Sequence, residues 1–317
     1  MFTLYLVVPC YNEEEVLPET AKRLVEKMNS LIKANKIKSS SRIVFVNDGS
    51  KDNTWSIISS LHEENKIFQG INLSKNKGHQ NALLAGLMTV KEYCDAAISL
   101  DADLQDDINA IDMMVEKFVE GNEIVYGVRN NRKKDTFFKK FTAEKFYKLL
   151  NFMGAEIVYN HADYRLMSRR ALDCLANFKE VNMFLRGIVP MIGFKSDIVD
   201  YERNERFAGE SKYPLKKMLA FALEGITSLS IKPIRTITSL GLIIFLISII
   251  MMVYFLARYF NGNTIQGWTS TILSIWSIGG LQILSIGIIG EYIGKIYLET
   301  KERPKYIIDK YLADDDL

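Results

Sequence analysis

The chain has few cysteines and no excess of either charge. Its 317 residues contain three cysteines, an odd number at wide spacing without a CxxC pair: Cys10, Cys94 and Cys174. This pattern excludes a disulfide framework and offers no zinc site, so we expect free thiols. Forty Lys and Arg residues nearly balance 38 Asp and Glu residues, for a net charge of +2. Nucleic-acid binding, which favours a strongly basic domain, therefore has no support.

Two common nucleotide-binding signatures are also missing. No GxGxxG sequence follows the first apolar run, and neither GxxxxGKS nor GxxxxGKT occurs in the chain. These absences weaken the case for a dinucleotide-binding domain or a P-loop. The N-terminal segment 1–15 has no basic residue ahead of its apolar run. We therefore expect a buried strand there rather than a signal peptide.

Charge is almost absent from one part of the chain. Between Thr236 and Ile293 only Arg258 and Glu291 are charged, although 25% of the whole chain is charged. The apolar stretches 236–258 and 268–293 are each long enough to cross a hydrocarbon core, which takes about 20 helical residues. We therefore predict two C-terminal transmembrane helices.

The positive charges around these stretches predict their orientation. Basic residues precede the first stretch and follow the second, whereas the connecting loop holds only Arg258. By the positive-inside rule, both termini face the cytoplasm of a multi-pass protein in the cell (inner or plasma) membrane. The expected parts are a cytosolic domain (1–211), a juxtamembrane amphipathic segment (212–235), transmembrane helices (236–258 and 268–293) and a cytosolic tail (294–317).

The N-terminal half alternates short apolar runs with segments of helical period. The runs are 4–9, 42–47, 67–73, 96–100 and 123–127, and the helical segments between them are 14–34, 54–65, 79–92 and 108–120. Such alternation predicts a Rossmann-like α/β domain with a mostly parallel sheet that is covered on both faces. In these sheets ligands bind beyond the carboxyl ends of the strands.

Acidic motifs follow two of the predicted strands. Asp101 and Asp103 can place two carboxylates on one side of a turn, with Gln105 as a third oxygen. Hard oxygen ligands of this kind suit Mg²⁺ or Mn²⁺ shared with a substrate diphosphate, although acidic turns are also common solvated loops. Asp48 can accept a hydrogen bond from a nucleobase or ribose; an Asx turn or a helix cap is the alternative.

A basic segment follows the fifth apolar run. Residues 129–148 contain eight basic and two acidic residues, interleaved with Phe and Tyr. A solvated helix face is the ordinary explanation of a charge run. The aromatic residues favour an amphipathic helix at a membrane surface, where Arg and Lys attract anionic headgroups.

Four segments together carry a resemblance to a known family. They are VVPCYNEEE (7–15), VNDGSKDNT (46–54), NKGHQNALLAGL (76–87) and LDADLQDD (100–107). They resemble the inverting GT-A glycosyltransferases of family 2. Segments 126–151, 162–172, 184–196 and 201–235 resemble polyprenyl-phosphate glycosyltransferases. The similarity is greatest to the bactoprenol glucosyltransferases, relatives of dolichol-phosphate mannose synthase.

The resemblance implies roles for individual residues. The nucleotide sugar would be bound by Pro9, Tyr11, Glu13, Asp48, Asp101 and Asp103. Asp101, Asp103 and Gln105 would hold Mg²⁺ or Mn²⁺. Phosphates of donor or acceptor would be contacted by Arg129, Arg132, Arg206 and Lys212. The catalytic candidates are Asp103 and Asp163, the latter as a base or as an acceptor-positioning group, which we favour; His79 is expected to pack or to cap a helix.

The implied activity is transfer of a hexose to undecaprenyl or another polyprenyl phosphate with inversion. UDP-glucose is the first choice of donor, with UDP-N-acetylhexosamine, GDP-mannose and UDP-aminoarabinose as alternatives. A homotetramer is plausible by the same resemblance. A processive polysaccharide synthase is a weaker alternative, because its QxxRW motif is absent. A membrane-anchored sugar-nucleotide sensor or lipid-translocation component is the alternative from a different class.

Overall fold

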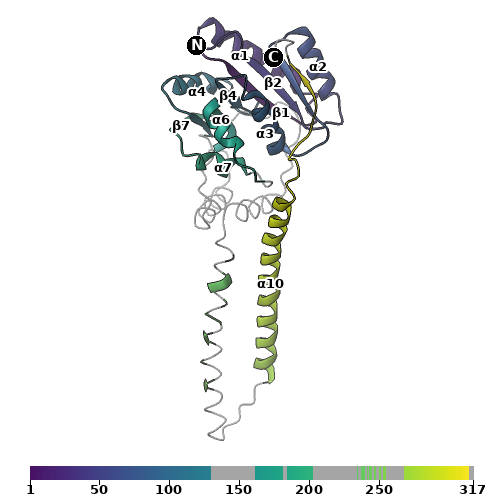
Figure 1. Ribbon diagram of the computed structural model, residues 1–317, viewed down its shortest axis with the longest axis vertical. Helices are drawn as coiled ribbons and strands as arrows, with labels where there is room; N and C mark the ends of the chain where they lie inside the picture. The colour runs from purple at the N-terminus through teal and green to yellow at the C-terminus, as the bar shows by residue number, and fades with distance from the viewer. Residues whose placement is uncertain are drawn as a thin grey trace.

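The computed structural model describes residues 1–129, 161–180, 184–202 and 268–313, with isolated positions between 234 and 254. Figure 1 shows a globular α/β domain from which one long helix projects. Three predicted phosphate-binding residues, Arg132, Arg206 and Lys212, lie outside the described residues. The juxtamembrane segment 212–235 lies outside them too, except for Ile234.

The first half of the domain alternates strands with helices, as the apolar pattern predicts. The strands are β1 (Leu4–Cys10), β2 (Arg42–Asn47), β3 (Phe68–Leu73), β4 (Ala96–Ser99) and β5 (Ile124–Arg129). The helices between them are α1 (Leu17–Lys33), α2 (Thr54–Glu64), α3 (His79–Val90) and α4 (Ala110–Val119). All five predicted strands and four predicted helices are confirmed, with ends that shift by up to three residues.

Three further strands and two short helices of the domain lie in the rest of the described residues. The second half contributes β6 (His161–Ser168), α6 (Arg169–Ala176), α7 (Leu185–Met191) and β7 (Ser196–Tyr201). The last strand, β8 (Ile308–Leu312), comes from the predicted tail and pairs antiparallel with β3. The sequence patterns predicted none of these elements.

The eight strands form one sheet in the order β7-β5-β6-β4-β1-β2-β3-β8. Strand β1 pairs in parallel with both β2 and β4, and β2 pairs in parallel with β3. Strand β6 runs antiparallel between β4 and β5, so the sheet is mixed but mostly parallel. The strand order reverses between β1 and β4, which is where an open α/β sheet forms its ligand crevice.

Apolar side chains cover both faces of the sheet, as a mostly parallel sheet requires. One core cluster packs α1 and α4 against Leu6, Val8 and Ile98, and the other packs α3 against Val7 and Val46. Helix α3 lies so close to the sheet that a Cβ atom on Gly86 would approach Val7 Cγ1 to 2.4 Å. Glycine at this position lets α3, and with it His79 at its first turn, sit close above the strand ends.

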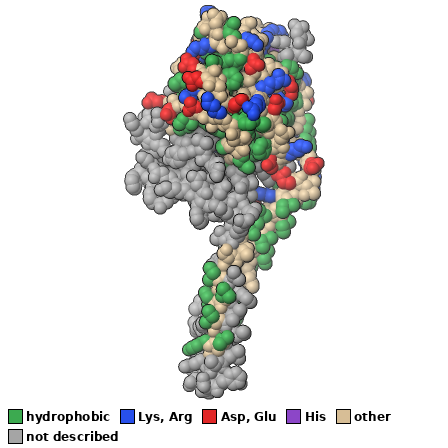
Figure 2. Space-filling view, turned by 60° about the vertical axis from the view of Figure 1, so that its left-hand side comes forward, with side chains coloured by type: hydrophobic (Ala, Val, Ile, Leu, Met, Phe, Trp, Pro, Cys, Tyr) green, Lys and Arg blue, Asp and Glu red, His purple; other side chains and the backbone are tan. Residues whose placement is uncertain are grey.

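Helix α10 (Trp268–Thr300) projects away from the domain (Figure 1). It contains Ile278–Thr300, the one segment in the described part of the chain that is long and apolar enough to cross a membrane. Apolar side chains line the described part of the projection, whereas charged side chains gather on the domain (Figure 2). The helix begins where the second predicted span begins and continues past Ile293. The first predicted span, 236–258, lies mostly outside the described residues, so a pair of spans stays a prediction.

Candidate active site

The predicted binding residues gather at one end of the sheet. Tyr11, Asp48 and Asp101 each follow the carboxyl end of a strand, β1, β2 or β4. These are neighbouring strands, and β1 and β4 flank the point where the strand order reverses. The structure therefore brings the three motifs to the edge where an α/β sheet binds its ligand.

The turn that carries Asp101 and Asp103 is held by its own backbone and by a buried side chain of α1. The backbone N–H of Gln105 donates to Asp103 Oδ1 at 3.2 Å, which orients that carboxylate. Leu104, which lies between Asp103 and Gln105 in the chain, has a φ of 58°, a left-handed conformation that is costly for a non-glycine residue. From α1, the buried Thr20 hydroxyl donates to the Ala102 carbonyl at 2.7 Å.

The Asp101 carboxyl is unusually hard to ionise. Burial raises its pKa to about 6, and the neighbouring carboxylates of Asp106, Asp163 and Asp103 act in the same direction, against an opposing effect of His79. The side chain nevertheless keeps 34% of its surface accessible, so a ligand can reach it. A nearby cation would relieve the cost of its negative charge.

The donor set at this turn fits a hard divalent cation that completes its coordination on a substrate. No group of three or more His, Cys, Asp or Glu side chains that could hold a metal exists among the described residues. Two carboxylates, Asp101 and Asp103, are what the turn offers. Mg²⁺ is commonly bound in this way, by one or two carboxylates together with substrate phosphates and water.

Asp163 lies near Asp101 because β4 and β6 are neighbouring strands. Ser99, the last residue of β4, pairs with Arg165 on β6, so the loop that leaves β4 toward Asp101 starts beside the part of β6 that holds Asp163. Asp163 is buried, and its Oδ2 accepts hydrogen bonds from Arg186 Nη2 at 3.0 Å and Nε at 3.3 Å. Its Oδ1 accepts from Nη2 of the buried Arg165 at 2.5 Å.

These two arginines decide the charge of Asp163. Burial alone would raise the pKa of its carboxyl, but Arg186 and Arg165, helped by His79, outweigh burial and hold the pKa well below its usual range. Asp163 is therefore an ionised carboxylate with paired oxygens at neutral pH. A group of this kind is a weak general base, since an effective base has a pKa near the working pH.

His79 lies between the two carboxylates instead of packing into the core. Its Nε2 is 3.5 Å from Asp101 Oδ1 and 3.8 Å from Asp163 Oδ2. Asp48 sets its place, because the Asp48 carboxylate accepts from the backbone N–H groups of Lys77 at 2.7 Å and Gly78 at 2.9 Å. Asp48 thus fixes the start of α3. The sequence alone did not predict these hydrogen bonds between Asp48 and the backbone before α3.

All the predicted nucleoside residues except Pro9 sit on two loops that are joined to each other. Tyr11 is exposed, whereas Pro9 is buried within β1. Asn12, with a φ of 54°, accepts from the Lys51 backbone N–H at 2.9 Å. The backbone N–H of Glu13 donates to Thr54 Oγ1 at 3.0 Å. These bonds hold the loop after β1 against the loop after β2.

Arg129 already has partners inside the domain. Its Nη2 donates to Asp106 Oδ1 at 3.1 Å and its Nε donates to the Tyr201 hydroxyl at 3.1 Å. The Tyr201 hydroxyl donates in turn to the same Asp106 oxygen at 2.6 Å. The three side chains tie β5 and β7 to the loop that follows Asp103. A phosphate bound by Arg129, as predicted, would therefore share its guanidinium with Asp106 and Tyr201.

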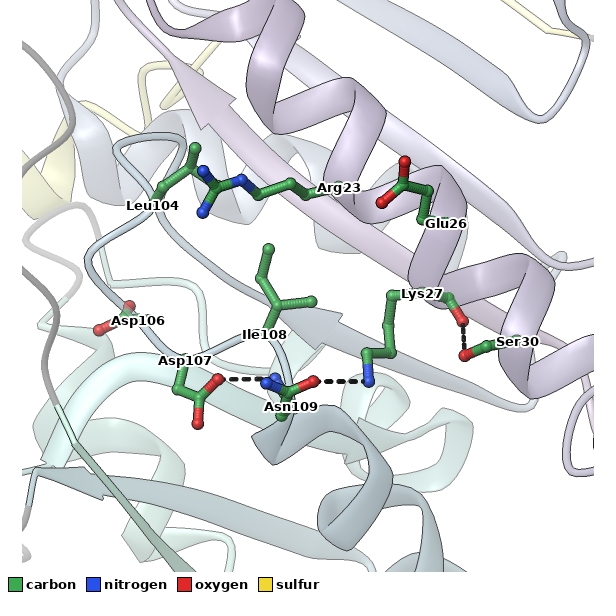
Figure 3. A pocket seen from close by; sticks show the side chains of 9 residues that line it. All are labelled: Arg23, Glu26, Lys27, Ser30, Leu104, Asp106, Asp107, Ile108 and Asn109. Carbon is green, nitrogen blue, oxygen red and sulfur yellow. Dashed lines mark hydrogen bonds between the residues drawn. The ribbon is translucent and has the colours of Figure 1, made fainter.

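A cavity of about 390 Å³ lies behind that loop, between α1 and residues 104–109 (Figure 3). Its two cations are already paired, Lys27 with Asp112 at 2.6 Å and Arg23 with Glu19 at 2.7 Å. Neither Asp101 nor Asp103 lines it. The predicted binding residues at the strand ends are therefore separate from this cavity.

Sequence reasoning missed two of the residues that meet at this site. Arg186 lies in the segment 184–196 that carried part of the resemblance, but no role was drawn from it. His79 lies in the segment 76–87, and its type and position, directly after a strand-end loop, were a usable signal. The contacts of both residues with Asp163, hydrogen bonds from Arg186 and a 3.8 Å approach of His79, join segments far apart in the chain, and no local pattern reports them.

The sequence matches a known family and named relatives. The family model "Glycosyl transferase family 2" matches residues 5–176. The "Uncharacterized glycosyltransferase YkoT" of Bacillus subtilis (strain 168) is 54% identical, covering 99% of this chain and 93% of that protein. The "Bactoprenol glucosyl transferase" of Shigella phage SfII is 41% identical, covering 96% of this chain and 97% of that protein. Among solved structures, mannosyl-3-phosphoglycerate synthase from Rubrobacter xylanophilus aligns with a TM-score of 0.48 at 15% identity, covering 70% of this chain and 71% of that chain.

Proposed function

The chain belongs to glycosyltransferase family 2, and on that basis we propose that it transfers a hexose from a nucleotide sugar to a polyprenyl phosphate. The proposed donor is UDP-glucose, the proposed acceptor is undecaprenyl phosphate, and the anomeric centre is inverted. The product, a sugar linked to a lipid phosphate, would serve cell-envelope glycosylation. Relatives named bactoprenol glucosyl transferase, 41% identical over nearly the full length, support the acceptor class.

One observation carries the proposal. Asp101, which with Asp103 is suited to a metal and a diphosphate, approaches the same His79 side chain as Asp163, a carboxylate that two arginines hold ionised. A donor side and an acceptor side thus face each other at the switch point of the sheet. This arrangement suits a direct displacement between two bound substrates.

The displacement needs positioning more than it needs a base. An oxygen of the lipid phosphate attacks the anomeric carbon, and the bond from that carbon to the nucleoside diphosphate breaks, with the electron pair leaving on the diphosphate. A phosphate monoester has a second pKa of about 6, so it is already largely dianionic at neutral pH. A divalent cation held by Asp101 and Asp103 would neutralise charge on the departing diphosphate. Asp163 acts as a positioning group.

We also propose that the protein works at the membrane. Support comes from α10, whose segment Ile278–Thr300 is apolar and has no buried residues in the candidate span. The chain then returns from α10 to the domain through β8. The helix would therefore emerge beside the catalytic sheet, which keeps the site near a lipid phosphate at the cytoplasmic surface. A homo-oligomer and a second span are parts of the same proposal.

A donor panel tests the proposed function. Purified full-length protein in detergent is incubated with undecaprenyl phosphate, Mg²⁺ or Mn²⁺, and one sugar nucleotide at a time: UDP-glucose, UDP-N-acetylglucosamine, GDP-mannose or UDP-aminoarabinose. The expected result is a lipid-linked sugar from UDP-glucose, with an anomeric configuration opposite to that of the donor. Transfer from a different donor would revise the sugar alone. No lipid product from any donor, or a polymer instead, would refute the function.

A further inference from the structure

One buried carboxylate oxygen near the strand ends has no hydrogen-bond partner among the residues that the structure describes. It is Oδ2 of Asp106, whose side chain is 3% exposed. The other oxygen, Oδ1, accepts from the Tyr201 hydroxyl at 2.6 Å and from Arg129 Nη2 at 3.1 Å. A buried acceptor without a donor is costly, and nearly all such atoms in native proteins have a partner. Asp106 Oδ2 therefore calls for a hydrogen-bond donor from outside the described residues.

The fold holds Asp106 at the edge of the sheet that carries Asp101 and Asp103. Arg129 and Tyr201 are the last residues of β5 and β7, and they are paired in the parallel ladder of these strands. Strands β4 and β5 both run antiparallel to β6, so their carboxyl ends lie at the same edge. The loop that leaves β4 through Asp101 and Asp103 is thus fastened, through Asp106, to the ends of β5 and β7.

The charge of Asp106 is felt at Asp101. Burial is the main cause of the raised pKa of Asp101, and His79 opposes it. Among the carboxylates that raise this pKa further, Asp106 acts more strongly than Asp163 or Asp103. The effect persists although a guanidinium pairs with the other oxygen of Asp106. A cation bound at Asp101 would therefore also be attracted by Asp106.

Asp106 does not complete a direct three-residue metal site. No group of three or more His, Cys, Asp or Glu side chains in the described part of the chain could hold a metal ion. A divalent cation on Asp101 and Asp103 would therefore keep several waters, as Mg²⁺ usually does. A metal polarises its bound water, and nearby carboxylates commonly accept hydrogen bonds from the ligands of a metal. Such water has the chemistry that the unpaired oxygen requires.

From this arrangement we propose that Asp106 is a positioning residue of the metal site, and that its Oδ2 accepts a hydrogen bond from water on the divalent cation held by Asp101 and Asp103. The inference rests on the proposed function and adds to it a residue that sets the hydration of the metal. Tyr201 and Arg129 act through Asp106, because they hold its other oxygen in place.

A second source of water lies behind the loop. Asp106 also lines the cavity between α1 and residues 104–109 (Figure 3). Water in that cavity could donate to the same oxygen without any metal. The metal is the better source, because the charge of Asp106 acts on Asp101, which does not line the cavity. The two sources predict different effects of Asp106 on metal affinity.

Metal binding without turnover tests the assignment. Mn²⁺ is titrated into full-length protein in detergent with UDP present, and free Mn²⁺ is followed by its EPR signal. Asp106→Asn keeps one oxygen for Tyr201 and Arg129 and replaces the other by an amide nitrogen. We expect it to weaken Mn²⁺ binding about tenfold or more, the size of one lost hydrogen bond to a charged group. Saturating Mn²⁺ should restore the wild-type affinity for UDP, because the loop keeps its shape.

Tyr201→Phe is a second variant that leaves Asp106 and its charge in place. It removes one of the two bonds that hold Asp106 Oδ1, so it should weaken Mn²⁺ binding by a smaller factor. If Asp106→Asn does not fold, Tyr201→Phe decides in its place. The matched control is Asp107→Asn, which removes the same charge from the next residue of the loop. Asp107 Oδ1 accepts from the backbone N–H of Asn109 at 2.9 Å, and this variant should bind Mn²⁺ as the wild type does.

Three results would overturn the assignment. Unchanged Mn²⁺ binding in Asp106→Asn would leave the oxygen to water in the cavity. Equal weakening by Asp106→Asn and Asp107→Asn would show that only the total charge of the loop matters. UDP binding that stays weak at saturating Mn²⁺ would show a distorted loop. A lipid product in the donor panel beside any of these results would leave the proposed function standing, so the two failures are distinguishable.

Discussion

Asp163 on β6 and Asp101 beyond the end of β4 both approach His79, whose Nε2 is 3.8 Å from Asp163 Oδ2 and 3.5 Å from Asp101 Oδ1. The donor-side carboxylate and the acceptor-side carboxylate are therefore neighbours although 62 residues separate them in the chain. The two carboxyl groups differ in protonation behaviour. Burial raises the pKa of Asp101 to about 6, whereas Arg186 and Arg165 overcome burial and lower that of Asp163.

Substitution of Asp163 tests whether it positions or deprotonates. Asp163→Asn should reduce kcat/KM strongly at every pH, because an amide orients Arg186 less well than a carboxylate. The low pKa of Asp163 means that the wild-type carboxylate is ionised throughout the range from pH 6 to pH 9. The variant should therefore show a pH profile parallel to the wild type. A wild-type rising limb that disappears in Asp163→Asn would instead identify a general base.

Substitution of Asp101 should stabilise the protein in a pH-dependent manner. Its folded-state pKa of about 6 exceeds the unfolded value, so the stability contributed by the protonated group is lost as pH rises from about 4 through about 6. In EDTA, Asp101→Asn should raise Tm by a few degrees at pH 8 and change it little at pH 4. The variant should also have lost its transferase activity. Thermal scans at the two pH values measure this. An equal shift at both values, or a lower Tm at pH 8, would contradict it.

The buried hydroxyl of Thr20 should matter for metal use as well as for stability. Thr20→Val keeps the volume but leaves the Ala102 carbonyl without its donor at 2.7 Å. We expect a loss of about 1 kcal/mol in unfolding free energy and a several-fold rise in the Mg²⁺ concentration for half-maximal activity. Thr20→Ser, which keeps the hydroxyl, is the control. If Thr20→Ser and Thr20→Val need the same Mg²⁺ concentration for half-maximal activity, the hydrogen bond from residue 20 to the Ala102 carbonyl does not shape the turn.

The C-terminal strand should support the nucleotide end of the site. Asn72 Nδ2 donates to Asp309 Oδ2 at 3.2 Å, and Asn47 Nδ2 donates to Asn72 Oδ1 at 2.7 Å, so side chains connect β8 to the residue before Asp48. Removal of residues 306–317 should lower Tm by several degrees and raise the KM for the nucleotide sugar. Removal of 314–317 alone, beyond β8, should do neither. Unchanged stability and donor KM in the longer deletion would leave β8 without a role in the site.

The sequence was informative where local pattern decides structure. Apolar runs and amphipathic segments predicted β1 to β5 and α1 to α4, since a strand buried on both faces needs a continuous apolar run. The same alternation put Asp101 and Asp103 after a strand, at the ligand-binding edge.

Local sequence patterns did not predict which distant segments of the chain pair with each other. Strand β6 contains Asp163 and Arg165, two charged residues in a buried strand, which hides it from a search for apolar runs. Helix α7 is seven residues long and includes Pro190, too short for a helical period to show. The sequence of β8 has the pattern of a charged tail, and its strand conformation comes from pairing with the edge strand β3. The ion pairs of Asp163 with Arg165 and Arg186 depend on the first two of these elements, so only the fold brings these side chains together.

The central claim is that the site around Asp101 and Asp103, at the strand ends, transfers a sugar to a lipid phosphate. The most direct measurement is the transfer of radiolabel from UDP-glucose to undecaprenyl phosphate by wild type and by Asp103→Ala, with Mg²⁺ or Mn²⁺ present. The wild type should place the label in an organic-extractable, mild-acid-labile lipid, and Asp103→Ala, folded and membrane-bound, should place none there. Wild-type turnover by Asp103→Ala, or a wild type that labels no lipid, would contradict the account.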